Sequence, residues 1–178
     1  MTAEVPLMKA YIQVYTGNGK GKTTAAFGLA LRAVGAGMSV FIGQFVKGKA
    51  YNENLAVARY LKNITVKQYG LDCFIVNDPT DADIKAAENG LREMRRIINK
   101  GKHDLVIMDE VNIALYYKLI DVDELIKIMK NKPEHVELIL TGRYAPQQII
   151  DLADLVTEMK EVKHYYQQGI EARKGIEY

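Results

Sequence analysis

The sequence predicts one α/β domain in which a mainly parallel β-sheet is covered by helices on both faces. Segments with the apolar pattern of strands alternate with segments of helical spacing, and strands joined through helices form right-handed βαβ units. A glycine-rich turn that ends in Gly-Lys-Thr separates the first such strand from the first helix. The chain has 178 residues and shows no internal repeat and no linker, so we expect a single domain over residues 1–178.

The strands are recognised by alternating or continuous apolar residues. We expect them at residues 10–15, 39–45, 64–69, 104–110, 136–142 and 155–158. The helices are recognised by apolar residues three and four positions apart and by their capping residues. We expect them at residues 25–34, 52–62, 84–98, 121–130 and 146–153. The remaining segments are a flexible lead-in at residues 1–9, a loop at residues 70–79 and a polar, aromatic tail at residues 160–178.

The helix at residues 84–98 has the clearest pattern. Thr80 and Asp83 have the spacing of a capping box before its start, and Gly101 follows its end. Its apolar residues lie on one face, which we expect to pack on the sheet: Ile84, Ala87, Leu91, Met94 and Ile98.

The residues from Thr16 to Thr24 read Thr-Gly-Asn-Gly-Lys-Gly-Lys-Thr-Thr and lie between a strand and a helix, the context of a phosphate-binding P-loop. Glycines let backbone N–H groups converge on an anion, and the following helix N-terminus adds N–H groups and a positive dipole end. The first glycine of the usual pattern is shifted by one position, because Thr16 stands in its place. The expected nucleotide-binding residues are Thr16, Gly17, Asn18, Gly19, Lys20, Gly21, Lys22, Thr23 and Thr24.

Two lysines of this turn favour a bound anion. A glycine-rich turn can lack a ligand, but the ammonium groups of Lys20 and Lys22 repel each other unless an anion lies between them. Lys22 is expected to bring its charge to the β- and γ-phosphates, and the hydroxyl of Thr23 is a ligand for Mg²⁺. The sequence therefore predicts a P-loop NTPase-like (RecA-like) α/β fold with a nucleotide site.

The predicted strand at residues 104–110 ends in two acids. Four apolar residues precede Asp109 and Glu110, which is the form of a Walker B strand. Such an acid holds Mg²⁺ directly or through water, and a second acid orients a reactant. We expect Asp109 on the metal side and Glu110 facing the substrate. Ligands of such sheets bind beyond the carboxyl ends of the strands, so Thr16, Asp109–Glu110 and Thr141–Arg143 should converge.

Arg143 follows the predicted strand at residues 136–142. Its side chain either lies on the surface or directs a charge at the phosphates, and the pattern leaves both open. The three histidines lack the spacing of metal ligands, and they are His103, His135 and His164.

Composition and charge exclude several classes of protein. A formal charge of +2, with basic residues spread along the chain, argues against nucleic-acid binding. No apolar run approaches the roughly 18 residues that span a bilayer, and the N-terminus lacks a signal-peptide pattern. The single cysteine, Cys73, excludes an internal disulfide and is expected to be a buried apolar residue. We expect a cytoplasmic protein that binds neither nucleic acid nor a membrane.

Residue patterns alone lead to a Mg²⁺-nucleotide-dependent α/β protein. Kinases, ATPases, GTPases and enzymes that transfer nucleotidyl or adenosyl groups stay open. A GTPase is disfavoured, because Asn131-Lys-Pro-Glu134 resembles the guanine motif Asn-Lys-x-Asp but ends in glutamate and follows no strand.

Several short segments accompany the P-loop. They are Arg32-Ala-Val-Gly35, Gln44-Phe-Val-Lys-Gly48, Asp109-Glu110, Thr141-Gly-Arg143, Asp151-Leu-Ala-Asp154, Val162-Lys-His164, Gly169 and Gly175-Ile-Glu-Tyr178. With the P-loop extended to Gly28, the chain from Tyr11 onward resembles the P-loop type of ATP:cob(I)alamin (corrinoid) adenosyltransferase.

The resemblance implies a reaction in which a reduced Co(I) corrinoid attacks C5′ of ATP, triphosphate leaves and an adenosylcobalamin-type cofactor forms. The nucleotide would lie reversed in the P-loop so that C5′ is exposed. The implied catalytic residues are Lys22, Glu110 and Arg143, with Thr23 and Asp109 as ligands of Mg²⁺ or Mn²⁺. The implied partners are ATP, a corrinoid, a flavoprotein that supplies electrons and a second copy of the chain in a homodimer.

One segment departs from the family pattern. Where the family has a Phe-x-Trp pair that packs on the corrin, this chain has Gly70-Leu-Asp-Cys-Phe74, and it contains no tryptophan. Leu71 and Phe74 are the candidates to replace that pair. Two other functions stay open: another P-loop ATPase or small-molecule kinase that releases ADP, and a non-catalytic protein that binds ATP or a corrinoid.

Overall fold

The computed structural model describes residues 9–49, 51–71 and 78–178. In this part of the chain six strands form one sheet in the order β3-β2-β4-β5-β1-β6, and every neighbouring pair is parallel. The strands are β1 (Ile12–Thr16), β2 (Val40–Phe45), β3 (Ile64–Tyr69), β4 (Leu105–Asp109), β5 (Glu137–Thr141) and β6 (Leu155–Glu158). All six predicted strands are therefore confirmed.

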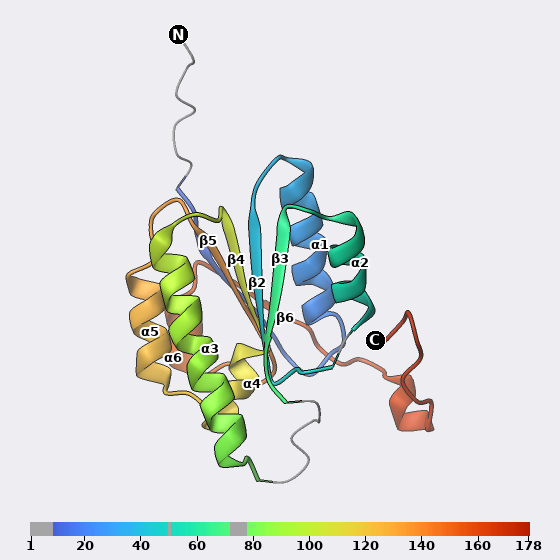
Figure 1. Cartoon of the computed structure of the whole chain (residues 1–178). Coiled ribbons are helices and arrows are strands. Elements are labelled where there is room, and N and C mark those ends of the chain that lie inside the picture. The colour runs from blue at the N-terminus through green and yellow to red at the C-terminus, as the bar shows by residue number, and fades with distance from the viewer. Residues whose placement is uncertain (1–8, 50, 72–77) are drawn as a thin grey trace.

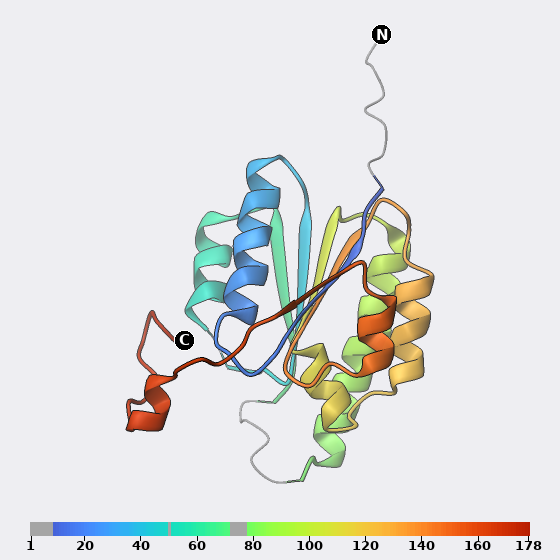
Figure 2. The ribbon, with the colours of Figure 1, turned by 180° about the vertical axis from the view of Figure 1, so that it is seen from behind.

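Helices cover both faces of the sheet (Figures 1 and 2). On one face lie α1 (Lys22–Gly35) and α2 (Asn52–Tyr60), and on the other lie α3 (Asp81–Lys100), α5 (Val122–Lys130) and α6 (Gln147–Leu152). The short helix α4 (Val111–Tyr116) follows β4, and the 3₁₀ helix η1 (Tyr165–Gln168) lies in the C-terminal tail, residues 160–178. None of the described helices is long and apolar enough to cross a membrane.

The central strand β4 shows why the sheet is buried on both faces. Successive side chains of a strand point to opposite sides. Leu105 and Ile107 belong to the apolar cluster under α1 and α2, whereas Val106 and Met108 belong to the cluster under α3, α5 and α6. The strand is thus held from both sides, and this fixes the position of Asp109 at its carboxyl end.

The sequence signals of α3 are confirmed in detail. Thr80 and Asp83 form the capping box, in which each side chain binds the backbone N–H of the other residue. Gly101 ends the helix in the left-handed conformation, with φ 58°.

Three features differ from the sequence-based expectation or lie beyond it. Helix α1 begins at Lys22, three residues before the expected start, so the Lys-Thr-Thr of the P-loop forms its first turn. Helix α4 was not predicted, because six residues are too few to show a helical period. The expected burial of Cys73 and the position of Phe74 lie outside the described residues.

Candidate active site

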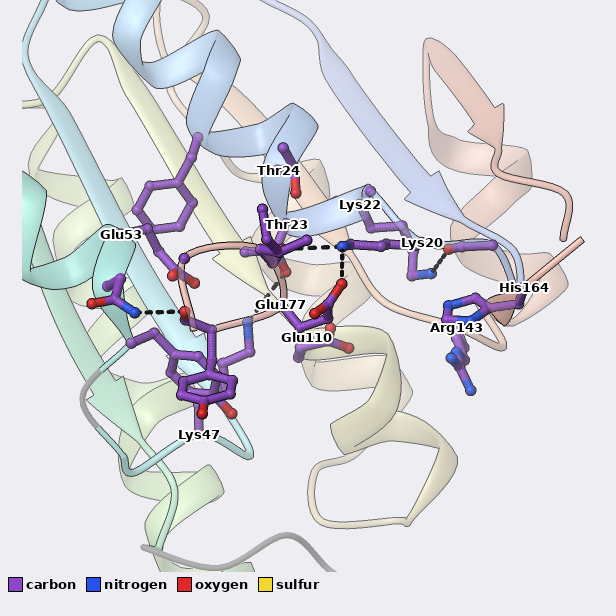
Figure 3. Close-up of a pocket in the computed structure, with 18 residues that line it drawn as sticks. Lys20, Lys22, Thr23, Thr24, Lys47, Glu53, Glu110, Arg143, His164 and Glu177 are labelled. Carbon is purple, nitrogen blue, oxygen red and sulfur yellow. Dashed lines mark hydrogen bonds and ion pairs between the residues drawn. The ribbon is translucent and has the colours of Figure 1, made fainter. Parts of the chain in front are cut away.

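A pocket of about 500 Å³ lies beyond the carboxyl ends of the strands. Four parts of the chain line it: the P-loop with the start of α1, the segment around the start of α2, the ends of β4 and β5, and the C-terminal tail (Figure 3). The lining residues are Gly19–Thr24, Phe27, Lys47, Tyr51–Glu53, Glu110, Arg143, His164 and Gly175–Tyr178. The predicted position of the ligand site in an α/β sheet and the position of this pocket agree.

The glycines of the P-loop serve close packing as well as turn geometry. The segment that leaves β6 crosses the loop, and the N–H of Gly19 donates to the carbonyl oxygen of Met159 at 2.6 Å. A Cβ at Gly17 would lie 2.6 Å from that oxygen, and one at Gly19 would lie 2.7 Å from it. Gly17 also has φ 91°. A side chain at either position would push the loop away from Met159.

Lys22 is buried and its side chain curls back over the P-loop. Its Nζ donates to the carbonyl oxygens of Gly17 and Gly19, each at 2.7 Å. Burial lowers the pKa of Lys22, with Glu110 acting against that change and Arg143 acting with it. Lys20 turns instead toward the C-terminal tail, where its Nζ lies 2.8 Å from Glu177. The two ammonium groups are thus each satisfied by protein groups, so the inference that they require an anion between them does not follow from this structure.

Asp109 is fully buried at the end of β4 and accepts hydrogen bonds at both carboxylate oxygens. Oδ1 accepts from the hydroxyls of Thr23 at 2.9 Å and Thr141 at 2.7 Å. Oδ2 accepts from Lys47 at 2.8 Å and from Gln44 at 3.1 Å. Burial alone would raise the pKa of Asp109, but the charge and hydrogen bond of Lys47, together with the two hydroxyls, outweigh burial and lower it.

Glu110 follows directly and is the N-cap residue of α4. Its backbone φ is 59°, a value that residues other than glycine seldom adopt. Its N–H donates to the hydroxyl of Thr141 at 2.9 Å, so one threonine on β5 contacts both Asp109 and Glu110. Burial raises the pKa of Glu110, and the charge of Asp109 raises it further. The unusual backbone is a form of local strain that proteins commonly keep at functional sites.

The structure brings most predicted site residues together. Arg143 is exposed on the protein surface and also lines the pocket, together with Lys22 and Glu110. Six of the nine predicted P-loop residues line the pocket. Thr16, Gly17 and Asn18 are not among the lining residues, and the hydroxyl of Thr16 instead accepts the N–H of Ala145 at 3.3 Å.

Sequence reasoning assigned no role to several residues that the structure places in or beside the pocket. Gln44 and Lys47 contact Asp109, and Glu177 contacts Lys20. Gln44 could have been recognised from the sequence, because it is a polar residue near the end of an otherwise apolar strand. Leu71, which we expected to help replace the aromatic pair, is exposed and is not among the residues that line this pocket.

The side-chain oxygens of Thr23 and Asp109 suit a hard divalent cation. Mg²⁺ binds carboxylate and hydroxyl oxygens together with water and phosphate oxygens, and Thr23 and Asp109 supply such oxygens side by side. The described residues contain no group of three or more histidine, cysteine, aspartate or glutamate side chains placed to hold a metal ion. The protein groups therefore fit a metal that takes most of its ligands from nucleotide and water.

Comparison with solved structures supports the fold. A KaiC-like protein from Pyrococcus horikoshii superposes with a TM-score of 0.55, covers 84% of this chain and 73% of its own, and is 20% identical. At that identity the likeness concerns the fold alone, and it confirms the predicted P-loop NTPase-like (RecA-like) class.

Comparison with protein sequences identifies the family. A corrinoid adenosyltransferase of Sinorhizobium sp is 37% identical over 174 residues, which are 96% of this chain and 81% of that protein. The corrinoid adenosyltransferase CobA of Salmonella typhimurium is 37% identical over 171 residues, which are 96% of this chain and 86% of that protein. The family model described as ATP:corrinoid adenosyltransferase BtuR/CobO/CobP matches residues 8–178. The chain therefore belongs to the family of ATP:corrinoid adenosyltransferases.

Proposed function

We propose that this adenosyltransferase moves the 5′-deoxyadenosyl group of ATP to the cobalt of a reduced Co(I) corrinoid and releases intact triphosphate. The observation that carries the proposal is the convergence of Lys22, Glu110 and Arg143 on one pocket, in a chain that matches the family from residue 8 to residue 178. In the reaction the electron pair of Co(I) forms the bond to C5′, and the electrons of the broken C5′–O bond leave with the triphosphate.

The protein's task in this reaction is to align two reactants and to stabilise the charge of the leaving group. Lys22 and Arg143 supply positive charge beside the P-loop, and the N-terminus of α1 supplies backbone N–H groups. For Lys22 to reach a phosphate, its ammonium leaves the two glycine carbonyls that hold it. The nucleophile is the corrinoid itself, so no side chain has to remove a proton from it.

We assign Thr23 and Asp109 to Mg²⁺, or to Mn²⁺ in its place. The Thr23 hydroxyl oxygen and Asp109 Oδ1 lie 2.9 Å apart beside the first turn of α1, where we expect the phosphates. When bound, the ion supplies charge that stabilises the triphosphate. We assign Glu110 to the ribose side, where its carboxylate accepts a hydrogen bond from a sugar hydroxyl and so fixes the direction of C5′.

We further propose a cytoplasmic homodimer that receives its corrinoid in reduced form from a flavoprotein. The family resemblance supports both partners. The edge strand β6 offers a surface for a second copy, since all four of its residues are exposed and Leu155 and Val156 are apolar. Sedimentation at micromolar protein tests the dimer, and a monomer at every concentration would contradict it.

An anaerobic assay tests the proposed function. The protein is mixed with chemically reduced cob(I)alamin, ATP and Mg²⁺, and the absorbance is followed until it stops changing. Formation of a light-sensitive adenosylcobalamin is the expected result. ATP binding without any adenosylated corrinoid would contradict it and would favour a protein that only binds nucleotide.

A further inference from the structure

Lys47 contacts both residues that are assigned to the metal. Its Nζ lies 2.8 Å from Oδ2 of Asp109 and 3.2 Å from the hydroxyl oxygen of Thr23. Its side chain is 11% exposed, and the Asp109 side chain is fully buried. A single positive charge thus already bridges the oxygens that suit Mg²⁺.

The backbone around Lys47 is held in place by close packing. Val46, the preceding residue, has φ 57°, which is rare for a β-branched residue. A Cβ at Gly70, at the end of β3, would lie 2.4 Å from the backbone nitrogen of Lys47. The neighbouring Tyr51 ring lies 5.2 Å from Nζ. These contacts fix the backbone of Lys47 and leave the end of its side chain in the pocket.

The hydrogen bonds of Asp109 indicate which of its donors a bound metal ion can displace. Four donors fill the two carboxylate oxygens, so a cation that binds this carboxylate directly displaces one of them. Gln44 and Thr141 are fully buried and do not line the pocket. Thr23 lines the pocket but is itself an expected ligand. Lys47 is the remaining donor, and it lines the pocket.

We infer that Lys47 holds the metal position of the nucleotide-free protein and moves toward the triphosphate when the metal-nucleotide complex binds. This inference rests on the proposed metal site at Thr23 and Asp109. Lys47 is then a positioning residue, because its hydrogen bond holds the carboxylate of Asp109 in place when no metal is bound. It also makes stable metal binding depend on the nucleotide, whose phosphates offer the ammonium a new partner.

The test measures Mn²⁺ binding to the nucleotide-free protein by electron paramagnetic resonance, for the wild type, Lys47→Gln and Lys49→Gln. Lys49 is an exposed lysine of the same loop, so its variant controls for the loss of one charge. We expect Lys47→Gln to bind Mn²⁺ more tightly than the wild type by a factor on the order of ten, the scale on which groups next to a metal ligand act. Lys49→Gln should match the wild type. Equal Mn²⁺ affinity in Lys47→Gln and the wild type would overturn the inference.

A second measurement covers the case in which Lys47→Gln does not fold. The lysines of the wild type are ¹³C-methylated, and the Lys47 signal is assigned by its absence in Lys47→Arg, which keeps the charge. The signal should differ between the nucleotide-free protein and the complex with ATP and Mg²⁺, and identical signals would overturn the inference. The adenosylation assay of the wild type tests the proposed function separately, since it does not depend on where Lys47 lies before nucleotide binds.

Discussion

The ammonium group of Lys20 lies 2.8 Å from Oε1 of Glu177, which joins the P-loop to the C-terminal tail. The same ammonium donates to the hydroxyl of Tyr165 at 3.1 Å and to the carbonyl oxygen of Ile176 at 3.0 Å. The tail also accepts a hydrogen bond from the Asn52 side chain on α2. The tail therefore forms one wall of the pocket, and it is held by contacts with the P-loop and with α2.

Replacing Glu177 by Gln should loosen this wall. The ion pair with Lys20 is lost, so backbone amides of the tail should exchange hydrogen faster. Global stability should change little, because the pair is only partly buried and such pairs contribute little. Hydrogen exchange followed by mass spectrometry measures this, with Glu171→Gln as the control, since Glu171 is exposed in the same tail. Equal exchange in the wild type and Glu177→Gln would show that other contacts hold the tail.

Replacing Lys22 by Ala should remove charge from the leaving-group side of the pocket. The expected loss is roughly 2–4 kcal/mol of transition-state stabilisation, which is the scale of a lost oxyanion-type donor and corresponds to a fall in kcat/KM of about 30-fold to 1,000-fold. Steady-state adenosylation with reduced corrinoid measures it, and Lys49→Ala is the control. A Lys22→Ala enzyme with unchanged turnover would remove Lys22 from the mechanism.

His103 should make stability depend on pH. Burial lowers the pKa of His103, Asp104 opposes this and Lys102 adds to it. Its Nδ1 is buried without a hydrogen-bond partner, and its ring packs on Phe41 at 5.5 Å. The pKa of His103 in the folded protein therefore lies below the value of about 6.5 expected in the unfolded chain. As the pH falls below about 6.5, the unfolded chain takes up the proton first, so the free energy of unfolding decreases.

The pH dependence is measured by urea unfolding at several pH values between about 7.5 and 5.5, around the unfolded pKa of histidine. The wild type should lose more free energy of unfolding over this range than His103→Leu. His164→Gln, in the tail, controls for the loss of one histidine. Parallel curves for the wild type and His103→Leu would show that His103 does not supply this dependence.

Gly90 should not tolerate alanine, although it lies within helix α3. A Cβ at Gly90 would lie 2.6 Å from Cγ of Tyr69 on β3. Overpacking of this kind costs about 1–3 kcal/mol, which should exceed the gain of about 1 kcal/mol from better helix propensity. Urea unfolding measures the change. Gly28→Ala in helix α1 is the matched control, because a Cβ there meets nothing within 4 Å, and it should stabilise by up to about 1 kcal/mol. Stabilisation by both substitutions would contradict the packing of α3 on β3.

The positions of the strands and of the two acids of the site could be predicted from the sequence. A strand buried on both faces is a continuous apolar run, so the point where it becomes polar marks its exposed end. This rule located Asp109 and Glu110, and the structure places them at the end of β4 as expected. The P-loop could also be predicted, because its glycines and lysines lie between an apolar strand and a helix.

The contacts of Lys47 and Glu177 could not be predicted in this way. Both residues lie in segments without a strand or helix period, and each finds its partner far along the chain: Lys47 is 62 residues from Asp109, and Glu177 is 157 residues from Lys20. Such pairs depend on the order of strands in the sheet and on the path of the tail. Neither follows from local pattern, so the side chains that complete the pocket appeared only in the structure.

The proposed function requires the γ-phosphate of ATP to leave as part of an intact triphosphate, so the fate of the γ-phosphate is the decisive observation. ATP labelled at the γ-phosphate is incubated anaerobically with the protein, Mg²⁺ and cob(I)alamin, and the labelled products are separated and counted against adenosylcobalamin. We expect one labelled triphosphate for each adenosylcobalamin formed. Labelled inorganic phosphate together with ADP, in place of triphosphate, would contradict the account and would point to a P-loop ATPase or kinase.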